Sequence, residues 1–305
     1  MRVAVSLQAL TLVAVLAPAA AFAQNPAQPL PAAPPAAPQT DYSQVQIKAT
    51  KIGDNFYALE GSGGMIGAQV GPDGVFMVDS QFAPLTDKIV AAIKQLSDKP
   101  IRFMVNTHVH PDHTGGNENL GKLGVTLMSR PQLRTRLAAR PVPPVGLATI
   151  TYDSKISLHM NGEEIQLIPV VTAHTDGDTM IYFPKNNVIM TGDFYRSIQY
   201  PYPDRANGGS FKGLIDGLNA VINLAGPATK IVPGHGPVVT KAEVAAHRDA
   251  ALAVQEKVAA LVKQGKTADE IVAAKVTAET DAKIQQPGTT GERFVRALVT
   301  ELTAR

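Results

Sequence analysis

The feature that most constrains this chain is a run of four metal-ligand side chains within six residues, His108-Val109-His110-Pro111-Asp112-His113. The run follows an apolar, strand-like segment at 101–106. On an extended strand end, His108 and His110 point to the same side, because side chains alternate along a strand. The proline then turns the chain, so that Asp112 and His113 face a second point nearby. This pattern predicts a metal site with imidazole and carboxylate ligands, rather than a solvated turn that contains histidines by chance.

The absence of cysteine from all 305 residues limits what can bind that metal. Disulfides, thiolate nucleophiles, iron–sulfur clusters and thiolate zinc sites are all excluded. Nitrogen and oxygen ligands remain, and the chain has seven histidines. The formal net charge of +2 gives no broad electrostatic field for nucleic acid or an anionic membrane. We therefore expect a small-molecule substrate and no nucleic-acid partner.

Residues 1–23 have the order of a secretory signal peptide. Met1 and Arg2 precede an apolar run at 3–17, and small residues end the segment at Ala21-Phe22-Ala23. That run is shorter than the roughly 20 residues that span a bilayer, so we expect cleavage rather than a membrane anchor. The mature protein is then periplasmic or secreted, with no stable membrane span. Residues 24–41, rich in proline and alanine, are expected to form a linker.

Residues 42–305 are expected to form one domain of the α/β class. Short apolar runs separated by Gly, Pro and Asp give way to a helical pattern, and this order of strands and helix occurs twice. It favours two sheets packed face to face with helices outside. The chain from Lys241 onward is mostly helical, and its apolar stripe suits a core or a dimer interface equally well, so the oligomeric state stays open.

Three further ligand-type residues follow strand-like runs elsewhere in the chain, namely His174, Asp193 and His235. Functional groups at the carboxyl ends of strands gather at one edge of a sheet. A single histidine or aspartate at such a place is a weak signal, because it often has only a structural role. Together with the first cluster, the three residues strengthen the prediction of a metal centre.

These motifs, in this order, resemble the metallo-β-lactamase superfamily, and the resemblance covers nearly all of 42–239. It is carried by His108-x-His110-x-Asp112-His113, by His174, by Thr191-Gly192-Asp193 and by Pro233-Gly234-His235-Gly236. The resemblance implies a four-layer αββα sandwich with two zinc ions at one edge, and iron or a mixed pair of metals stays open. It also implies a ligand set: His108, His110 and His174 on one zinc, Asp112, His113 and His235 on the other, and Asp193 bridging both.

Two departures from the lactamases bear on the activity. Lactamases of the commonest subclass use a cysteine ligand, and all-histidine lactamases usually have a serine where Asp193 stands. A bridging aspartate is similar to glyoxalase II, homoserine-lactone lactonases and related esterases. The resemblance thus implies an exported dinuclear zinc hydrolase, whose metal-bound hydroxide attacks a small ester, lactone, thioester or related carbonyl substrate while Asp112 orients it. A β-lactamase and an iron-dependent oxidoreductase similar to persulfide dioxygenase stay open as alternatives.

Supporting and substrate-contacting residues are less specific in the sequence. Asp79, Thr107 and Asp178 are candidates for holding the outer nitrogens of ligating imidazoles, although turn chemistry explains such residues as well. Four residues after Asp193 are candidates for substrate contact: Tyr195, Arg196, Tyr200 and Tyr202. A phenol could donate to an oxyanion and an arginine could bind a carboxylate, but a packed aromatic loop fits the pattern equally well.

Overall fold

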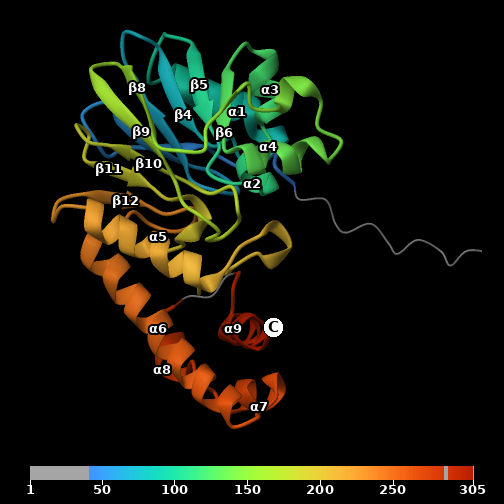
Figure 1. The fold of residues 1–305 in the computed structure, drawn as a ribbon. Helices are drawn as coiled ribbons and strands as arrows, with labels where there is room; N and C mark the ends of the chain where they lie inside the picture. Colours follow the sequence, from blue (N-terminus) through green and yellow to red (C-terminus); the bar gives the residue numbers. More distant parts are fainter. Residues whose placement is uncertain (1–40, 285–287, 305) are drawn as a thin grey trace, which may run out of the picture. The chain divides into compact units, whose positions relative to one another are not determined.

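The computed structural model describes residues 41–284 and 288–304, and two β-sheets lie face to face within it (Figure 1). The first sheet has its strands in chain order: β1 (Lys48–Lys51), β2 (Phe56–Glu60), β3 (Ile66–Gln69), β4 (Val75–Val78), β5 (Ile101–Val105), β6 (Thr126–Ser129) and β7 (Ile150–Thr151). The second has the order β12-β11-β10-β9-β8: β8 (Ile156–Met160), β9 (Glu163–Pro169), β10 (Thr179–Phe183), β11 (Val188–Met190) and β12 (Lys230–Val232). The expected signal peptide at 1–23, and the expected linker up to residue 40, lie outside the described residues.

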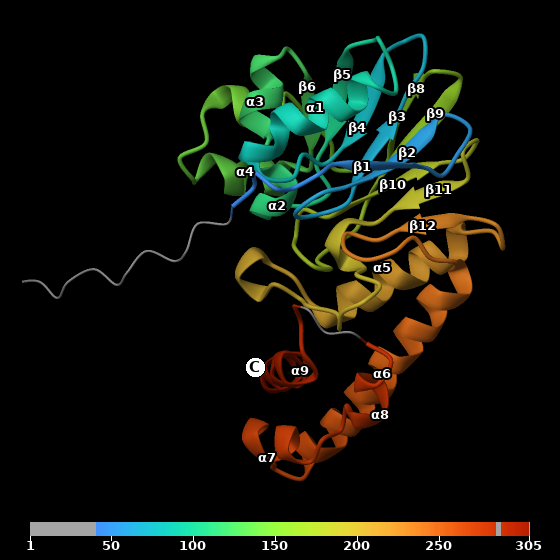
Figure 2. The same cartoon turned by 180° about the vertical axis from the view of Figure 1, so that it is seen from behind.

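Helices cover the outer face of each sheet, as Figure 1 and Figure 2 show from opposite sides. The first sheet packs against α1 (Thr86–Lys94) and α3 (Asn117–Lys122), and the second against α5 (Phe211–Leu224) and α6 (Lys241–Lys263). The shorter helices are α2 (Pro111–Thr114), α4 (Pro131–Ala138), α7 (Ala268–Ala273) and α8 (Ala278–Asp281), with the 3-10 helices η1 (Ala83–Leu85), η2 (Pro144–Gly146), η3 (Gly192–Phe194) and η4 (Arg205–Asn207). The final helix, α9 (Gly291–Thr303), packs against α6 and α7.

Side-chain alternation along the strands creates the apolar layers of this sandwich. In β4, Phe76 and Val78 lie between the two sheets, whereas Val75 and Met77 belong to the cluster beneath α1. In the second sheet Ile189 faces the α5 side while its two neighbours in β11 face the first sheet. Burial on both faces explains why these strands are continuously apolar. The predicted arrangement of two sheets with helices outside is confirmed.

The helix α6 begins at Lys241, where the sequence predicts the helical part of the chain to start. Thr240 accepts a hydrogen bond from the N–H of Glu243, and the Glu243 side chain accepts one from the N–H of Thr240, which completes a capping box. Only one stripe of the helix is buried, which includes Val254 and Val258, and charged residues lie on the rest of its surface. Among the residues that the structure describes, no helix combines the length and the apolar character needed to cross a membrane.

Helix α4 was not predicted from the sequence. Only Leu133 and Leu137 of this helix are buried, so its apolar pattern is a single pair four residues apart. Pro131 at the first helical position marks its beginning, because proline lacks the N–H that a first-turn residue leaves unbonded anyway. The apolar periodicity of this helix is therefore too weak to predict it, and its position after β6 matters more.

The topology brings the predicted ligands to one edge of the sandwich. Strands β4 and β5 run parallel, as do β11 and β12, so each pair ends at the same edge. Asp79 follows β4, His108 lies beyond β5, Asp193 lies beyond β11 and His235 lies beyond β12. These residues lie just after the strands and not within them, and they meet because the carboxyl ends of parallel strands lie at the same edge of a sheet.

Candidate metal centre

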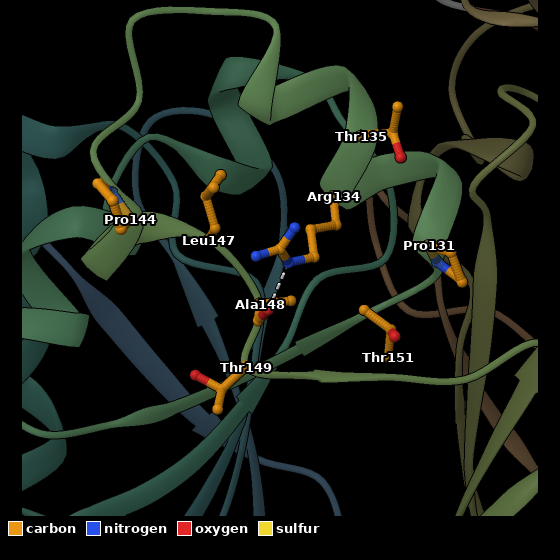
Figure 3. A pocket seen from close by; sticks show the side chains of 8 residues that line it. All are labelled: Pro131, Arg134, Thr135, Pro144, Leu147, Ala148, Thr149 and Thr151. Atoms are coloured by element: carbon orange, nitrogen blue, oxygen red, sulfur yellow. Dashed lines mark hydrogen bonds between the residues drawn. The ribbon is translucent and has the colours of Figure 1, made fainter.

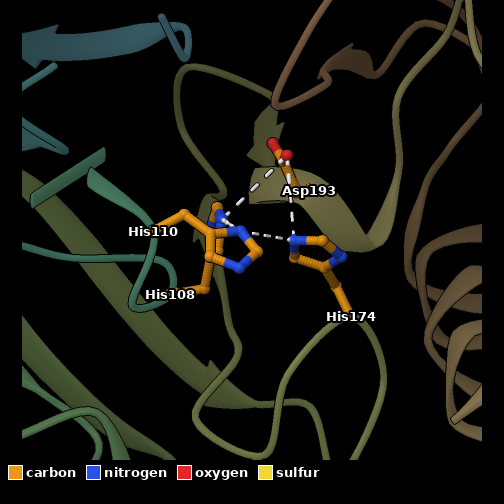
Figure 4. A group of neighbouring side chains, drawn as sticks. All are labelled: His108, His110, His174 and Asp193. Atoms are coloured by element: carbon orange, nitrogen blue, oxygen red, sulfur yellow. Dashed lines mark hydrogen bonds and ion pairs between the residues drawn. The ribbon is translucent and has the colours of Figure 1, made fainter. Parts of the chain in front are cut away.

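The seven side chains predicted as metal ligands meet at this edge in two adjoining groups. Within each group the ligand atoms lie within 4.8 Å of one another. The first group, drawn in Figure 4, consists of His108, His110, His174 and Asp193, and the second of Asp112, His113 and His235. Figure 4 shows the side chains of the first group pointing toward one another, with His108 and His110 on one segment and His174 and Asp193 on two others.

In the first group, two histidines present Nε2 to the centre and the third presents Nδ1. His108 Nε2 lies 3.2 Å from His110 Nδ1, and His174 Nε2 lies 2.9 Å from that same atom of His110. Oδ2 of Asp193 is 3.8 Å from His174 Nε2 and 4.0 Å from His108 Nε2. Strand β5 ends at Val105, so His108 and His110 do not lie on an extended strand, and that part of the sequence argument was wrong. They converge because the irregular segment after β5 presents Nε2 of one ring and Nδ1 of the other.

The second group lies on the other side of Asp193. His113 Nε2 is 3.1 Å from Asp193 Oδ1, and His235 Nε2 is 3.3 Å from it. Asp112 Oδ2 is 3.1 Å from His235 Nε2 and 3.6 Å from His113 Nε2. Asp193 therefore turns one carboxylate oxygen to each group, which is the geometry that a bridging ligand needs.

Outer hydrogen bonds fix the orientation of two rings in the first group. His110 Nε2 lies 2.7 Å from Asp204 Oδ2, and His174 Nδ1 lies 2.6 Å from the carbonyl oxygen of Tyr202. A carboxylate and a carbonyl only accept, so each ring must donate from its outer nitrogen. A neutral ring then has a lone pair on the nitrogen that faces inward.

Asp79 supports the ring of His113 directly and that of His108 through Thr107. Its carboxylate accepts hydrogen bonds from the N–H and the hydroxyl of Thr107, both at 2.7 Å, and lies 2.7 Å from His113 Nδ1. Because the Thr107 hydroxyl donates to Asp79, its oxygen is free to accept from His108 Nδ1 at 3.1 Å. Asp79 has a φ of 61°, a conformation uncommon for a residue with a side chain, which these bonds sustain. Asp79 and Thr107 thus contact the rings as predicted.

The inward lone pairs make the centre fit a cation. In neutral rings the lone pairs of His110 Nδ1 and His174 Nε2 face each other at 2.9 Å, which is repulsive. In the second group His113 Nε2 and Asp193 Oδ1 are both buried and have no hydrogen-bond partner, although they lie only 3.1 Å apart. Divalent metal ions relieve both conflicts, since imidazole nitrogens and carboxylate oxygens are ligands that zinc and iron accept.

In the second group the neighbouring carboxylates raise the pKa values of both rings. Burial opposes a charge on His235, but Asp193 and Asp112 outweigh it and raise the pKa of this ring to about 9. Burial likewise disfavours the charged form of His113, yet Asp193 and Asp79 raise its pKa well above the usual value. The same charges hold the pKa of Asp193 well below its usual range despite burial.

In the first group, two of the rings have lowered pKa values instead. Burial lowers the pKa of His174 to about 3, and the positive charge of Arg196 adds to this against the attraction of Asp193. Burial, followed by repulsion from His113, lowers the pKa of His108 well below its usual value. The two groups therefore differ in charge although they share Asp193.

Two glycines allow the backbone to lie directly against the second group. A side chain at Gly64 would overlap the ring of His113, and one at Gly234 would overlap Oδ1 of Asp193. The N–H of Gly64 donates to the Asp112 carbonyl at 3.0 Å, and the N–H of Met65 donates to the Gly234 carbonyl at 2.8 Å. Beside these loops a cavity of about 380 Å³ opens, with His235 in its wall. The glycines are thus required for close approach to the candidate ligands.

The four candidate substrate residues fall into two pairs. Tyr195 and Tyr200 are buried in the core beneath α6 and α9, and the Tyr200 hydroxyl donates to Asp281 at 2.6 Å. The structure does not bring these two phenols to the candidate ligands. The ring of Tyr202 lies 6.2 Å from that of His174. The charge of Arg196 helps to lower the pKa of His174, and the charge of Asp193 acts on Arg196 in turn, so this second pair borders the first group.

Asp178, which the sequence suggested as a support for a ring, stabilises a turn instead, and another aspartate supports a ring. Asp178 accepts hydrogen bonds from the N–H groups of His174 and Thr175 and from the Thr175 hydroxyl, so it stabilises the turn and contacts no ring. Asp204, which was not predicted, accepts from the ring of His110. Asp204 also accepts hydrogen bonds from Asn207 at the start of η4, and nothing in that cap pattern distinguishes it from ordinary turn chemistry.

A larger cavity of about 580 Å³ lies between α4 and the segment 144–151 (Figure 3). Its wall contains prolines, threonines and Arg134, whose Nε donates to the Ala148 carbonyl at 3.0 Å, as the dashed line in Figure 3 marks. None of its lining residues belongs to either ligand group. The size of a cavity therefore does not locate the chemistry in this protein.

The chain belongs to the metallo-beta-lactamase superfamily, whose family model matches residues 61–235. Among curated proteins it is 23% identical over 252 residues to a linear primary-alkylsulfatase from Pseudomonas sp. (strain ATCC 19151), covering 66% of this chain and 48% of that protein. It is 24% identical over 161 residues to a metallo-beta-lactamase type 2 from Elizabethkingia meningoseptica, covering 50% and 64%. The chain thus spans about half the length of the first relative and less than two thirds of the second.

Solved structures show the same fold. A metallo-beta-lactamase from Pontibacter korlensis superimposes with a TM-score of 0.60 at 17% identity, covering 67% of this chain and 99% of that one. The stereoselective inverting sec-alkylsulfatase Pisa1 from Pseudomonas sp. superimposes with a TM-score of 0.68 at 16% identity, covering 83% of this chain and 50% of that one. The predicted family and fold are confirmed.

Proposed function

We propose that this protein is an exported hydrolase with two zinc ions, acting on a small ester, lactone, thioester or related carbonyl compound. One observation carries the proposal: seven histidine and aspartate side chains converge with their lone pairs directed inward. His108, His110 and His174 would hold one ion, Asp112, His113 and His235 the other, and Asp193 both. Residues 42–305 form the catalytic domain in this proposal, preceded by a signal peptide at 1–23 and a linker at 24–41.

Two divalent ions at these positions would supply a hydroxide nucleophile near neutral pH and polarise a carbonyl oxygen. The two aspartates beside these positions have different surroundings and different proposed roles. Asp193 is only 6% exposed and is held between the groups, whereas the Asp112 side chain is 23% exposed. Asp112 is therefore the carboxylate that faces the approaching reactants, and it orients the attacking water and accepts its proton.

The substrate class follows from the ligand set and from what borders it. Asp193 replaces the serine or cysteine of most lactamases, which favours esters, lactones and thioesters over β-lactams. Tyr202 and Arg196 lie beside the first group and are the proposed substrate contacts of the four candidates. The names of the similar proteins add sulfate esters and β-lactams as substrates that must be assayed.

The test begins with protein purified without added metal, followed by zinc loading and an assay panel of a lactone, a thioester, a phosphodiester, an alkyl sulfate and a chromogenic cephalosporin. We expect two zinc ions per chain and turnover of the lactone or the thioester. Stoichiometric iron with oxygen consumption would instead establish an oxidoreductase. Turnover of the cephalosporin alone would establish a β-lactamase.

A further inference from the structure

A loop at residues 195–204, here named the tyrosine loop, connects the first ligand group to the C-terminal helices. Its carbonyl at Tyr202 accepts from His174 Nδ1, and its last residue, Asp204, accepts from His110 Nε2. Both contacts are made at the outer nitrogens, which decide where the inner nitrogens point. The position of the tyrosine loop therefore sets the orientation of two of the three rings.

Aromatic contacts fasten the middle of the tyrosine loop to α9. The ring of Tyr200 stacks on that of Phe294, with centroids 5.1 Å apart and an interplanar angle of 18°. Both side chains are fully buried. Two residues further on, the guanidinium of Arg293 lies 4.0 Å from the centroid of the Tyr202 ring, a cation–π contact.

Polar contacts fasten the first half of the loop to the segment before α9. The Arg196 guanidinium donates to the Tyr200 carbonyl at 3.1 Å within the loop and to the Thr289 hydroxyl at 2.8 Å outside it. The side-chain oxygen of Gln199 accepts from Arg196 at 2.8 Å and from the N–H of Thr289 at 3.3 Å. The hydroxyl of Tyr200 reaches Asp281 in α8. We name Asp281, Thr289, Arg293 and Phe294 the C-terminal clamp.

We infer that the C-terminal clamp positions the tyrosine loop so that Tyr202 and Asp204 hold His174 and His110 in the arrangement that binds the first metal ion. The residues of the clamp are positioning residues, since the contacts of Asp281, Thr289, Arg293 and Phe294 described above all go to the loop. All four lie beyond residue 235, where the match to the family model ends. The inference rests on the proposed metal site, and it adds that residues outside the site orient the ligands of one of its two metal positions.

The second ligand group provides an internal reference for this inference. Asp79 after β4 supports the ring of His113, and the backbone at Gly64 lies against the same ring. The start of the tyrosine loop reaches this group through backbone alone, because the N–H of Ser197 donates to the His235 carbonyl at 3.0 Å. None of the clamp contacts described above is made to Ser197 or to His113, so loosening the clamp should disturb the first position more than the second.

The test compares Arg293→Ala and Phe294→Leu with Arg296→Ala. Arg296 is the matched control, because it lies on the same helix, is exposed and pairs with Glu292 and Asp269 instead of the loop. Cobalt(II) titration of metal-free protein, followed by its visible spectrum, should show affinity at one of two positions reduced about tenfold in the two clamp variants and unchanged in the control. Nitrogen-15 NMR of the metal-free variants should show changed ring signals for His110 and His174, and unchanged signals for His113.

The two readouts separate the ways in which this account can fail. If wild-type protein binds no metal, the proposed function is wrong, while the NMR comparison still tests the positioning. If wild-type protein binds two ions and the clamp variants match Arg296→Ala in both readouts, the clamp does not position the loop. Equal weakening of both metal positions would show a general loss of stability and would also overturn the inference.

Discussion

The two ligand groups share Asp193 and differ in what surrounds them. In the first group the pKa values of His108 and His174 are lowered, and the rings are oriented by Thr107 and by a loop that packs against the C-terminal helices. The second group has rings with raised pKa values and is supported by Asp79 and by glycine backbone. The first group is thus connected to a distant part of the chain through side chains, and the second is supported mainly by segments at the edge of the sandwich.

The largest effect is expected from Asp193→Ala, because Asp193 alone faces both groups. Without its two oxygens, neither position keeps a full ligand set, and both ions should be lost. Turnover should fall about a thousandfold or more, since the metal ions supply several kcal/mol of transition-state stabilisation. Metal content and turnover would be measured beside Asp249→Ala, which removes an exposed carboxylate. Retention of both ions would remove the bridging role.

Gly64→Ala should damage the second group selectively. The added methyl group overlaps the ring of His113, so either the ring or the loop must move. We expect a cost of about 2 kcal/mol in stability and a loss of zinc from the second position. Gly226→Ala is the control, because its methyl group meets no atom closer than 3.6 Å. Chemical denaturation and zinc titration check both variants, and equal behaviour of the two would contradict the close-approach argument.

Asp204→Asn should weaken the first position by about tenfold in metal affinity. Both carboxylate oxygens of Asp204 accept hydrogen bonds, from His110 Nε2 and from Asn207, whereas an asparagine has one acceptor oxygen and no charge. The bond that orients the His110 ring is therefore weakened, while His113 keeps its support from Asp79. Competition with a zinc chelator measures each affinity. A loss shared equally by both positions would show that the groups are not independently supported.

The smallest effect on the metal centre is expected at His247, which lies outside both groups with its ring 5.4 Å from Tyr195. Burial, followed by the charge of Arg196, lowers its pKa to about 4. The unfolded chain takes up this proton near pH 6.5 and the folded chain only near pH 4, so stability falls as pH drops across that interval. His247→Leu should reduce this fall by on the order of 2 kcal/mol relative to the exposed His159→Leu. Identical pH profiles of unfolding for the two variants would contradict the assignment.

The sequence predicted the parts of the site that rest on local pattern. Asp79 and Asp193 follow short apolar strands, and parallel pairing takes such residues to one edge. Asp204 and Phe294 could not be predicted, because their roles depend on contacts with residues far away in the chain. Tyr200 was ambiguous for the same reason: the pattern that suggested a substrate contact equally describes the packed phenol found in the core.

The central claim is that inward lone pairs of these residues hold two metal ions, and anomalous X-ray diffraction from zinc-loaded crystals tests it directly. We expect two anomalous peaks, one for each zinc ion. One should lie about 2.1 Å from His108 Nε2, His110 Nδ1 and His174 Nε2, and the other at a similar distance from His113 Nε2 and His235 Nε2. A single peak, or bonding through the outer nitrogen of His110 or His174, would contradict it.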